Sequence, residues 1–381
     1  MKIVAPLLLL ALSSSLSAQV TEIACPNGGI QPRLQRTADG VLHLVYFTGQ
    51  PTSGDLYYVR SEDDGATFGP ALRVNAKEGA VDASGPARGG AIVVDASGGV
   101  HVAWLGAKEA APDLVPEGRA ILYSRLPAGA QEFEAMRHLS KSRLDPRTAP
   151  TLVVGLGKLY VFWHAEGEAL AGASEQEPGR RVYMNESMDL GATFSDPRAV
   201  DDERFGVSAD CGLSSTFSRK NKLYVMYRSR DGRDRNLRLL VSEDEGKTFL
   251  SSHSADLRQR RTVETTTAMA TSTREPVVVI ENDGLFWSGI NDAAGRMGVP
   301  IAPRKKDVWR SRPTICANDV KAVILAWVEG DEEGDVDRIG WQIFDQVGRF
   351  KIDLGYLEGS PSPNTSPAVF ARSDNGFTIV Y

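Results

Sequence analysis

Hydrophobic residues recur along this chain as short apolar runs that end in an aromatic residue. The runs are GVLHLVYF (40–47), GVHVAWLG (99–106), KLYVFWHA (158–165), KLYVMYRS (222–229), KAVILAWV (321–328) and GFTIVY (376–381), with PVVVIEND (276–283) as a weaker copy. Successive copies begin about 45 to 65 residues apart. Because no sustained helical periodicity lies between them, this repeat predicts an all-β chain folded as a β-propeller.

Each run is preceded by a second apolar segment, and in most repeats that segment begins at a proline. These prolines are Pro32, Pro86, Pro150, Pro313 and Pro367. Proline donates no ladder hydrogen bond, so it suits the first residue of a strand. Turn sequences such as TADG (37–40) and DASGG (95–99) then join the two segments. We therefore expect blades of four strands, in which a tight turn joins strands one and two.

The number of blades is left open between six and seven. Seven inner hairpins can be counted, with starts near residues 32, 86, 150, 211, 267, 313 and 367. The seventh has no outer strands after it, because the sequence ends at Tyr381. Either residues 20–30 complete a seventh blade, or one hairpin is misassigned and the ring has six.

The first 18 residues carry the pattern of a secretory signal peptide: a lysine, an apolar run from Ile3 to Leu12, and then small residues. We expect a secreted or periplasmic protein whose residues 19–381 form a single propeller domain. No later segment is apolar enough for a membrane anchor. A net charge of −6 argues against general nucleic-acid binding, and we expect a monomer.

Three cysteines, Cys25, Cys211 and Cys316, allow at most one intramolecular disulfide, and the sequence does not choose the pair. No two cysteines stand at metal-site spacing, and the five histidines are scattered. The carboxylate run EGDEEGDVD (329–337) is interpreted as a solvated hairpin loop. We expect neither a metal nor a cofactor.

One eight-residue phrase occurs three times, as SEDDGATF (61–68), SMDLGATF (187–194) and SEDEGKTF (242–249). Its aspartate can accept backbone hydrogen bonds in an Asx-type turn, its glycine suits a position that a Cβ would penalise, and its phenylalanine can fill space between sheets. The phrase therefore predicts a structural clasp between strands three and four. The residues concerned are Ser61, Asp63, Gly65, Thr67, Phe68, Ser187, Asp189, Gly191, Thr193, Phe194, Ser242, Asp244, Gly246, Thr248 and Phe249.

These phrases resemble the Asp-boxes (BNR repeats) of the sialidase-like β-propellers. The resemblance implies a six-bladed ring, a glycoside hydrolase of the exo-sialidase type, and Asp-boxes on the side away from the active site. Strand polarity agrees, because the turns between strands one and two share a face with those between strands three and four. The functional residues are then expected on the opposite face.

Residues at the start of strand one and at the end of strand two lie nearest the axis on that face. They are Arg147, His164, Asp210, Tyr227, Arg228, Glu264, Arg310, Arg312 and Glu329, with Asp82 and Arg88 as looser candidates. Guanidinium groups match planar anions such as a sugar carboxylate in a bidentate way. We assign ligand binding to Arg147, His164, Arg228, Arg310, Arg312 and Glu329, and catalysis to Asp210, Tyr227 and Glu264.

The resemblance also implies an Arg-Ile-Pro-like motif that supplies the first of three arginines in true sialidases. In GGIQPRLQ (28–35) the motif is absent, since Ile30 stands in the register of the arginine. By strand alternation Arg33 is expected to point to the other side of the strand, and the arginines of WRSRPTI (309–315) are also out of phase. Two functions are left open. The first is a secreted sialidase-like hydrolase of an anionic glycan, and the second is a non-catalytic propeller that binds a glycan or a protein.

Overall fold

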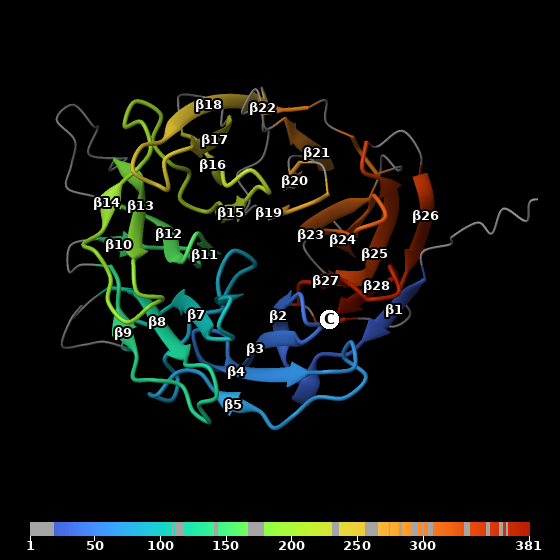
Figure 1. Ribbon diagram of the computed structural model, residues 1–381, viewed down its shortest axis with the longest axis horizontal. Coiled ribbons are helices and arrows are strands. Elements are labelled where there is room, and N and C mark those ends of the chain that lie inside the picture. The colour runs from blue at the N-terminus through green and yellow to red at the C-terminus, as the bar shows by residue number, and fades with distance from the viewer. Residues whose placement is uncertain are drawn as a thin grey trace, which may run out of the picture.

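The computed structural model describes residues 19–108, 110, 118–140, 144–166, 179–230, 236–255, 266–273, 275–281, 284–291, 296–298, 301–303, 308–330, 336–347, 351–357, 361–362 and 365–381. Over these residues the chain consists of β-strands and a single short 3-10 turn, Pro26–Gly28, which confirms the all-β class. The strands form seven sheets around a common axis, as Figure 1 shows face-on. The fold is a β-propeller.

Blades 1 to 6 are antiparallel sheets in which successive strands of the chain follow one another from the axis outward. Blade 1 contains β2 (Ile30–Arg36), β3 (Leu42–Gln50), β4 (Ser53–Ser61) and β5 (Leu72–Arg73), and blade 2 contains β6 (Gly90–Val94), β7 (Val100–Leu105), β8 (Ile121–Leu126) and β9 (Arg137–His138). Blade 3 contains β10 (Asp145–Pro146), β11 (Thr151–Gly155), β12 (Lys158–Glu166), β13 (Arg180–Ser187) and β14 (Arg198–Ala199).

The next three blades follow the same plan. Blade 4 contains β15 (Ser214–Phe217), β16 (Leu223–Arg228), β17 (Leu237–Ser242) and β18 (Leu250–Ala255), and blade 5 contains β19 (Thr267–Ala270), β20 (Val277–Glu281), β21 (Leu285–Asn291) and β22 (Arg296–Met297). Blade 6 contains β23 (Trp309–Ala317), β24 (Ala322–Gly330), β25 (Val336–Asp345) and β26 (Lys351–Tyr356).

Blade 7 joins the two ends of the described chain. Its inner hairpin is β27 (Ala368–Ala371) and β28 (Phe377–Val380), and β1 (Val20–Ile23) pairs in parallel with β28. Three backbone hydrogen bonds extend this closure, among them Cys25 N to Tyr381 O at 2.6 Å. The count of seven hairpins is therefore confirmed, and the six blades implied by the family resemblance are wrong. Among the described residues the seventh blade has three strands instead of the four expected, and the N-terminal β1 is the third.

The second strand of each blade is buried on both faces, which explains its continuous apolar run. All six residues of β7 and of β16 are buried, as are all nine of β24. The aromatic residue that ends such a run packs between neighbouring blades, and Trp104, Trp163 and Trp327 are fully buried there. Seven hydrophobic clusters, most of them spanning two adjacent blades, form the core of the described chain.

The repeated eight-residue phrase forms the turn between the third and fourth strands of blades 1, 3 and 4. In blade 3, Asp189 accepts hydrogen bonds from Thr193 N at 2.8 Å, Thr193 Oγ1 at 2.7 Å and Ser187 Oγ at 2.8 Å. Gly191 has a φ of +83°, a left-handed conformation that a side chain would strain. The same bonds recur around Asp63 and Asp244, and the threonine bonds in particular lower the pKa of all three carboxyls to about 2.

These turns also fasten each blade to the one before it. Phe194 meets Tyr123 of blade 2 at 4.8 Å between ring centroids, and Phe249 meets Phe162 of blade 3 at 6.0 Å. Arg137 of blade 2 donates to Gly191 O, and Arg198 of blade 3 donates to Gly246 O. The phrase is therefore a structural clasp within a blade and a contact between blades.

Removing β1 is expected to destabilise the ring, because β28 would become an exposed strand edge and the buried Cys25 would be lost from its cluster. A chain that begins at Asn27 should show a lower melting temperature and concentration-dependent association, measured by calorimetry and by light scattering after gel filtration. A chain that begins at Gln19 retains β1 and serves as the control. Equal melting temperatures for the two chains would contradict the closure described here.

Buried histidines are expected to make the fold acid-sensitive. Burial lowers the pKa of His43, whose Nδ1 lies 2.8 Å from Tyr58 Oη, to about 4. An unfolded histidine takes up its proton near pH 6.5, so the free energy of unfolding should fall as pH drops from about 6.5 to about 4, by at most about 1.4 kcal/mol per pH unit for each such histidine. Denaturant unfolding of wild type and His43→Gln at several pH values measures this slope. Parallel curves for the two proteins would rule out the contribution of His43.

Candidate functional site

The two faces of the ring differ in what they present. The clasp turns and the tight hairpin turns lie on one face, which we call the lower face. The starts of the innermost strands and the ends of the second strands lie on the other, the upper face. At the axis of the upper face a pocket of about 220 Å³ opens among the innermost strands. This mouth pocket is lined by Pro32, Arg33, Leu34, Pro86, Thr266, Thr267, Ala268, Met269, Arg312, Pro313, Thr314, Ile315, Ser366, Pro367, Ala368 and Val369.

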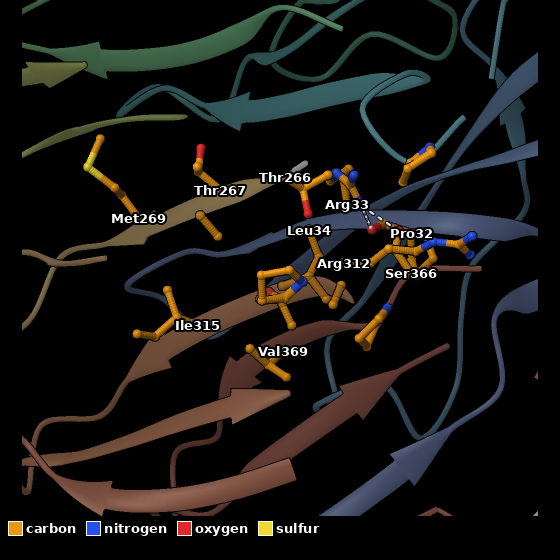
Figure 2. A pocket seen from close by; sticks show the side chains of 16 residues that line it. Pro32, Arg33, Leu34, Thr266, Thr267, Met269, Arg312, Ile315, Ser366 and Val369 are labelled. Atoms are coloured by element: carbon orange, nitrogen blue, oxygen red, sulfur yellow. Dashed lines mark hydrogen bonds between the residues drawn. The ribbon is translucent and has the colours of Figure 1, made fainter. Parts of the chain in front are cut away.

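The mouth pocket has a polar end and an apolar end. Figure 2 shows Arg33, Arg312 and Ser366 at one end, and Met269 and Ile315 at the other. Four apolar residues, Leu34, Met269, Ile315 and Val369, also line a larger cavity of about 750 Å³ that lies nearer the lower face. These four side chains therefore form an apolar waist between the mouth pocket and that lower cavity.

Arg33 lines the mouth pocket, contrary to the expectation that it points to the other side of the strand. The pairing of β2 with β3 shifts register between Ile30 and Arg33, and Gln31 has a left-handed φ of +52°. A bulge of this kind takes up extra residues and reverses the alternation of side chains beyond it. The Arg33 guanidinium is thereby turned to the axis, where Nη1 donates to Pro32 O at 3.0 Å and to Ser366 Oγ at 3.1 Å.

The electrostatic setting of Arg33 is unusual for a half-buried cation. In the described part of the chain no carboxylate forms an ion pair with its guanidinium, which bonds to a carbonyl and a hydroxyl instead. Burial lowers the pKa of Arg33 below its ordinary value, because desolvation disfavours the charged form. The polar end of the mouth pocket therefore contains a positive charge that its described neighbours do not neutralise.

Arg312 reaches the same pocket through a second bulge. Here β23 shifts register against β24 between Ser311 and Thr314, and Arg312 has a φ of +52° directly before Pro313. Arg312 was selected from the sequence as a residue near the axis, and it does line the mouth pocket. Its Nη1 donates to Thr365 O at 2.7 Å.

Glu281 lies directly behind this wall and was not expected from the sequence. It ends β20 and is 6% exposed. Its Oε2 accepts hydrogen bonds from Arg312 N at 3.2 Å and from Thr266 N and Oγ1, both at 3.4 Å. Burial raises the pKa of Glu281 to about 7, and the bonds to Arg312 and Thr266 oppose that rise.

Two of the other candidates join blades together. His164 is fully buried, and its Nε2 lies 2.9 Å from Thr148 Oγ1 and 3.0 Å from Cys211 O in the segment that leads into blade 4. Burial lowers the pKa of His164 to about 3, so the ring stays neutral and donates to the carbonyl. Arg228 is 1% exposed, and its Nη2 donates to Glu281 O at 2.8 Å. Neither residue lines the mouth pocket.

Three further candidates take part in ion pairs away from the mouth pocket. Arg310 and Glu329, both buried, meet at 2.8 Å, and the other oxygen of Glu329 pairs with Arg338 at 2.9 Å. Arg147 is partly exposed and lies 3.6 Å from Asp145 and 3.8 Å from Glu166. The looser candidates form a similar cluster, in which Asp82 accepts from Arg119 and Ser84 and lies 3.7 Å from Arg88.

The three residues assigned to catalysis are not brought together among the described residues. Asp210 is exposed in the turn before β15 and does not line the mouth pocket. Tyr227 is fully buried in the cluster between blades 3 and 4, and burial raises the pKa of its hydroxyl. Glu264 lies outside the described residues.

Hydrogen bonds on the upper face link all seven blades in one circuit. Gln31 donates to Ala83 O before blade 2, Ala149 N of blade 3 donates to Ala87 O, and His164 reaches Cys211 O of blade 4. Arg228 of blade 4 donates to Glu281 O of blade 5, and Arg312 N of blade 6 donates to the Glu281 side chain. Arg312 Nη1 donates to Thr365 O before blade 7, and Arg33 of blade 1 donates to Ser366 Oγ, which closes the circuit. Most of the polar residues nearest the axis therefore hold the ring closed.

Two signals in the sequence could have identified the missed residues. Glu281 is the polar residue that ends the apolar run PVVVIE, and the ends of such runs are where Arg228 and Glu329 were selected. Ser366 and Thr266 stand at the start of strand one in blades 7 and 5, beside Pro367 and Thr267. The orientation of Arg33 carries no such signal, because the bulge before it depends on backbone geometry.

Among the described residues we find no metal cluster, no disulfide and no membrane-spanning helix. Within the described ranges no three His, Cys, Asp or Glu side chains gather as metal ligands. None of Cys25, Cys211 and Cys316 forms a disulfide, so no pair has to be chosen. The part of the chain that the structure describes contains no helix of the length and apolar character that a membrane crossing requires.

Replacing Tyr227 with Phe is expected to leave both the fold and ligand binding unchanged, because its ring serves the core between blades 3 and 4. Tyr227→Ala is the contrasting variant, and its lost packing should lower the free energy of unfolding by about 3–5 kcal/mol. Denaturant unfolding and binding on a glycan array measure the two effects. Loss of binding in a folded Tyr227→Phe protein would show that the hydroxyl has a functional role.

Comparisons with known proteins agree with the propeller. No family model and no curated protein matches the chain. It is similar to a Dyadobacter fermentans protein of unknown function (TM-score 0.54, 14% identity, 83% of this chain and 94% of the other) and to a Penicillium chrysogenum α-L-arabinanase in complex with arabinobiose (TM-score 0.54, 13%, 84% and 93%). It is also similar to a Hadza microbial sialidase (TM-score 0.52, 13%, 83% and 68%). At these identities the likeness establishes the fold alone, which is a β-propeller.

Proposed function

We propose that this chain is an exported propeller that recognises an anionic glycan in the mouth pocket. The observation that carries the proposal is Arg33, a half-buried guanidinium in the pocket wall without a carboxylate partner among the described residues. A desolvated charge of this kind is costly unless it is paired. A carboxylate or sulfate that enters the pocket would supply the opposite charge, and a guanidinium can bind it through two parallel hydrogen bonds.

The division of the pocket into polar and apolar ends suits a sugar acid. The hydroxyls of Thr266, Thr267 and Ser366 can exchange hydrogen bonds with sugar hydroxyls near the arginines. The rings of Pro32, Pro313 and Pro367 present C–H surfaces against which the apolar face of a sugar can pack. Ligand sites commonly combine such an apolar lining with a few polar groups that fix orientation.

The size of the pocket favours a single unit rather than a long chain. Its volume of about 220 Å³ is below the roughly 300–1,000 Å³ of pockets that hold drug-sized ligands. The waist at Leu34, Met269, Ile315 and Val369 ends it on the side of the lower cavity. We therefore propose recognition of a terminal acidic sugar or of a free one.

We propose that the protein binds a glycan without hydrolysing it. Hydrolysis of a glycoside by the common two-carboxylate route needs acidic groups on both sides of the scissile bond. The lining of the mouth pocket contains no Asp or Glu among the described residues, and Asp210 and Tyr227 lie elsewhere. The similar arabinanase and sialidase structures support a carbohydrate ligand for this fold without fixing the chemistry.

The test is binding of the purified protein to an array of sialylated, uronic-acid, sulfated and neutral glycans. We expect binding confined to acidic glycans and a loss of about 10- to 100-fold in Arg33→Ala, which corresponds to one charge-assisted hydrogen-bonding group. Arg33→Lys should bind weakly as well, because lysine lacks the planar fork. Arg36→Ala, three residues along β2 at the lower cavity, is the matched control and should bind as wild type.

Three results would contradict the proposal. One is failure of the folded wild type to bind any acidic glycan, and another is equal binding of neutral glycans. The third is unchanged affinity in a folded Arg33→Ala protein. Turnover of a fluorogenic glycoside panel by the wild type would replace recognition with hydrolysis.

A further inference from the structure

Glu281 occupies a position that connects the mouth pocket to three blades. Its side chain comes from the end of β20 in blade 5, and Oε2 bonds to Thr266 at the start of the neighbouring inner strand and to Arg312 N in blade 6. Its main-chain carbonyl accepts from Arg228 of blade 4. Thr266 and Arg312 line the pocket, whereas Glu281 stands one residue behind it.

We propose that Glu281 is a positioning residue of the mouth pocket and that an anion entering the pocket is bound together with one proton, which Glu281 takes up from solvent. The inference rests on the proposed function of the mouth pocket as an anion site. It adds a pH-dependent affinity that the arginines alone would not produce.

The positioning role follows from the backbone of Arg312. A residue that precedes proline favours extended backbone, yet Arg312 has a φ of +52°. The hydrogen bond from Arg312 N to Glu281 Oε2 and the bond from Arg312 Nη1 to Thr365 O hold this conformation from two sides. Without an acceptor at residue 281 the bulge loses one of these restraints, and the guanidinium loses its fixed position at the pocket wall.

The proton uptake follows from the charges around Glu281. Among the described residues two cations face Glu281: Arg312 from β23 and Arg228 from the end of β16. Thr266, directly before β19, contributes only uncharged donors. Arg312 favours the ionised carboxylate, while burial opposes ionisation more strongly and raises the pKa of Glu281 to about 7. A bound anion places a second negative charge close to Glu281, and like charges disfavour ionisation. Binding should therefore raise this pKa further, and affinity should fall as pH rises through about 7.

The test measures binding of D-glucuronate and of N-acetylneuraminate by calorimetry at pH 6 and pH 8, since both probes stay ionised over this range. Wild type should bind about fivefold more tightly at pH 6 than at pH 8, which corresponds to a rise of about one unit in the pKa of Glu281 on binding. Glu281→Gln keeps an acceptor for Arg312 N and Thr266 but cannot ionise. It should bind equally at both pH values, with the affinity that wild type shows at pH 6.

Two further variants separate positioning from charge. Glu281→Ala removes the acceptor and should bind at least tenfold more weakly than Glu281→Gln at both pH values. Asp319→Asn removes a negative charge beside the lower cavity and should retain the pH dependence of wild type. If Glu281→Ala matches Glu281→Gln, the positioning role is excluded. If the pH dependence persists in Glu281→Gln, the proton is taken up elsewhere.

A measurement without ligand distinguishes failure of this inference from failure of the proposed function. A carboxyl with a folded pKa of about 7 holds its proton above the unfolded value, so ionisation disfavours the folded state as pH rises from about 4.5 to about 7. The stability of wild type relative to Glu281→Gln should decline over that interval and level off above it. If the stability difference between wild type and Glu281→Gln does not change with pH, proton uptake by Glu281 is excluded and the proposed function of the mouth pocket is unaffected. A declining difference with no binding of either probe contradicts the proposed function.

Discussion

Contact between neighbouring blades holds the ring together. A four-stranded sheet that is apolar on both faces cannot be stable alone, and each blade here buries its faces against the blades beside it. At the ends of the described chain this requirement is met by the parallel pairing of β1 with β28. On the upper face it is met by the circuit of hydrogen bonds that runs from Gln31 through His164, Arg228 and Glu281 back to Arg33.

This circuit explains why few of the polar residues near the axis are left for a ligand. His164 and Arg228 are fully or almost fully buried, and each reaches the backbone of a neighbouring blade. Arg310 and Glu329 neutralise one another inside blade 6. Arg33 donates to a hydroxyl of blade 7, and among the described residues no carboxylate forms an ion pair with its guanidinium. The candidate site is therefore defined by a pocket-lining cation whose charge the described residues leave unmatched.

The fold was predictable because its signals repeat. Seven copies of an inner hairpin and three copies of the clasp reinforce each other, so an error in any one unit does not change the architecture. Strand polarity likewise placed the starts of the innermost strands, where the mouth pocket opens, on the face opposite the clasps. The six-bladed alternative came from family resemblance, and the pairing of Val20–Ile23 with Phe377–Val380 shows why the local count was the better guide.

The site was predictable only in part, because it depends on two departures from regular strands. Strand alternation placed Arg33 away from the axis, and the bulge at Gln31 reverses that assignment. Arg312 was selected near the axis and lines the pocket through a second bulge, which the sequence did not predict. Glu281 was missed since its repeat is the weakest match to the common pattern. Tyr227 met the positional criterion but faces the core, and Glu264 lies outside the described residues.

We propose that the mouth pocket binds an anionic group between Arg33 of blade 1 and Arg312 of blade 6. A crystal structure of the protein with a bound acidic sugar would decide this. We expect the carboxylate within hydrogen-bonding distance of both arginines, with the sugar ring against the prolines and nothing beyond the apolar waist. An acidic sugar bound at the lower face or in the lower cavity, with the mouth pocket empty, would contradict it.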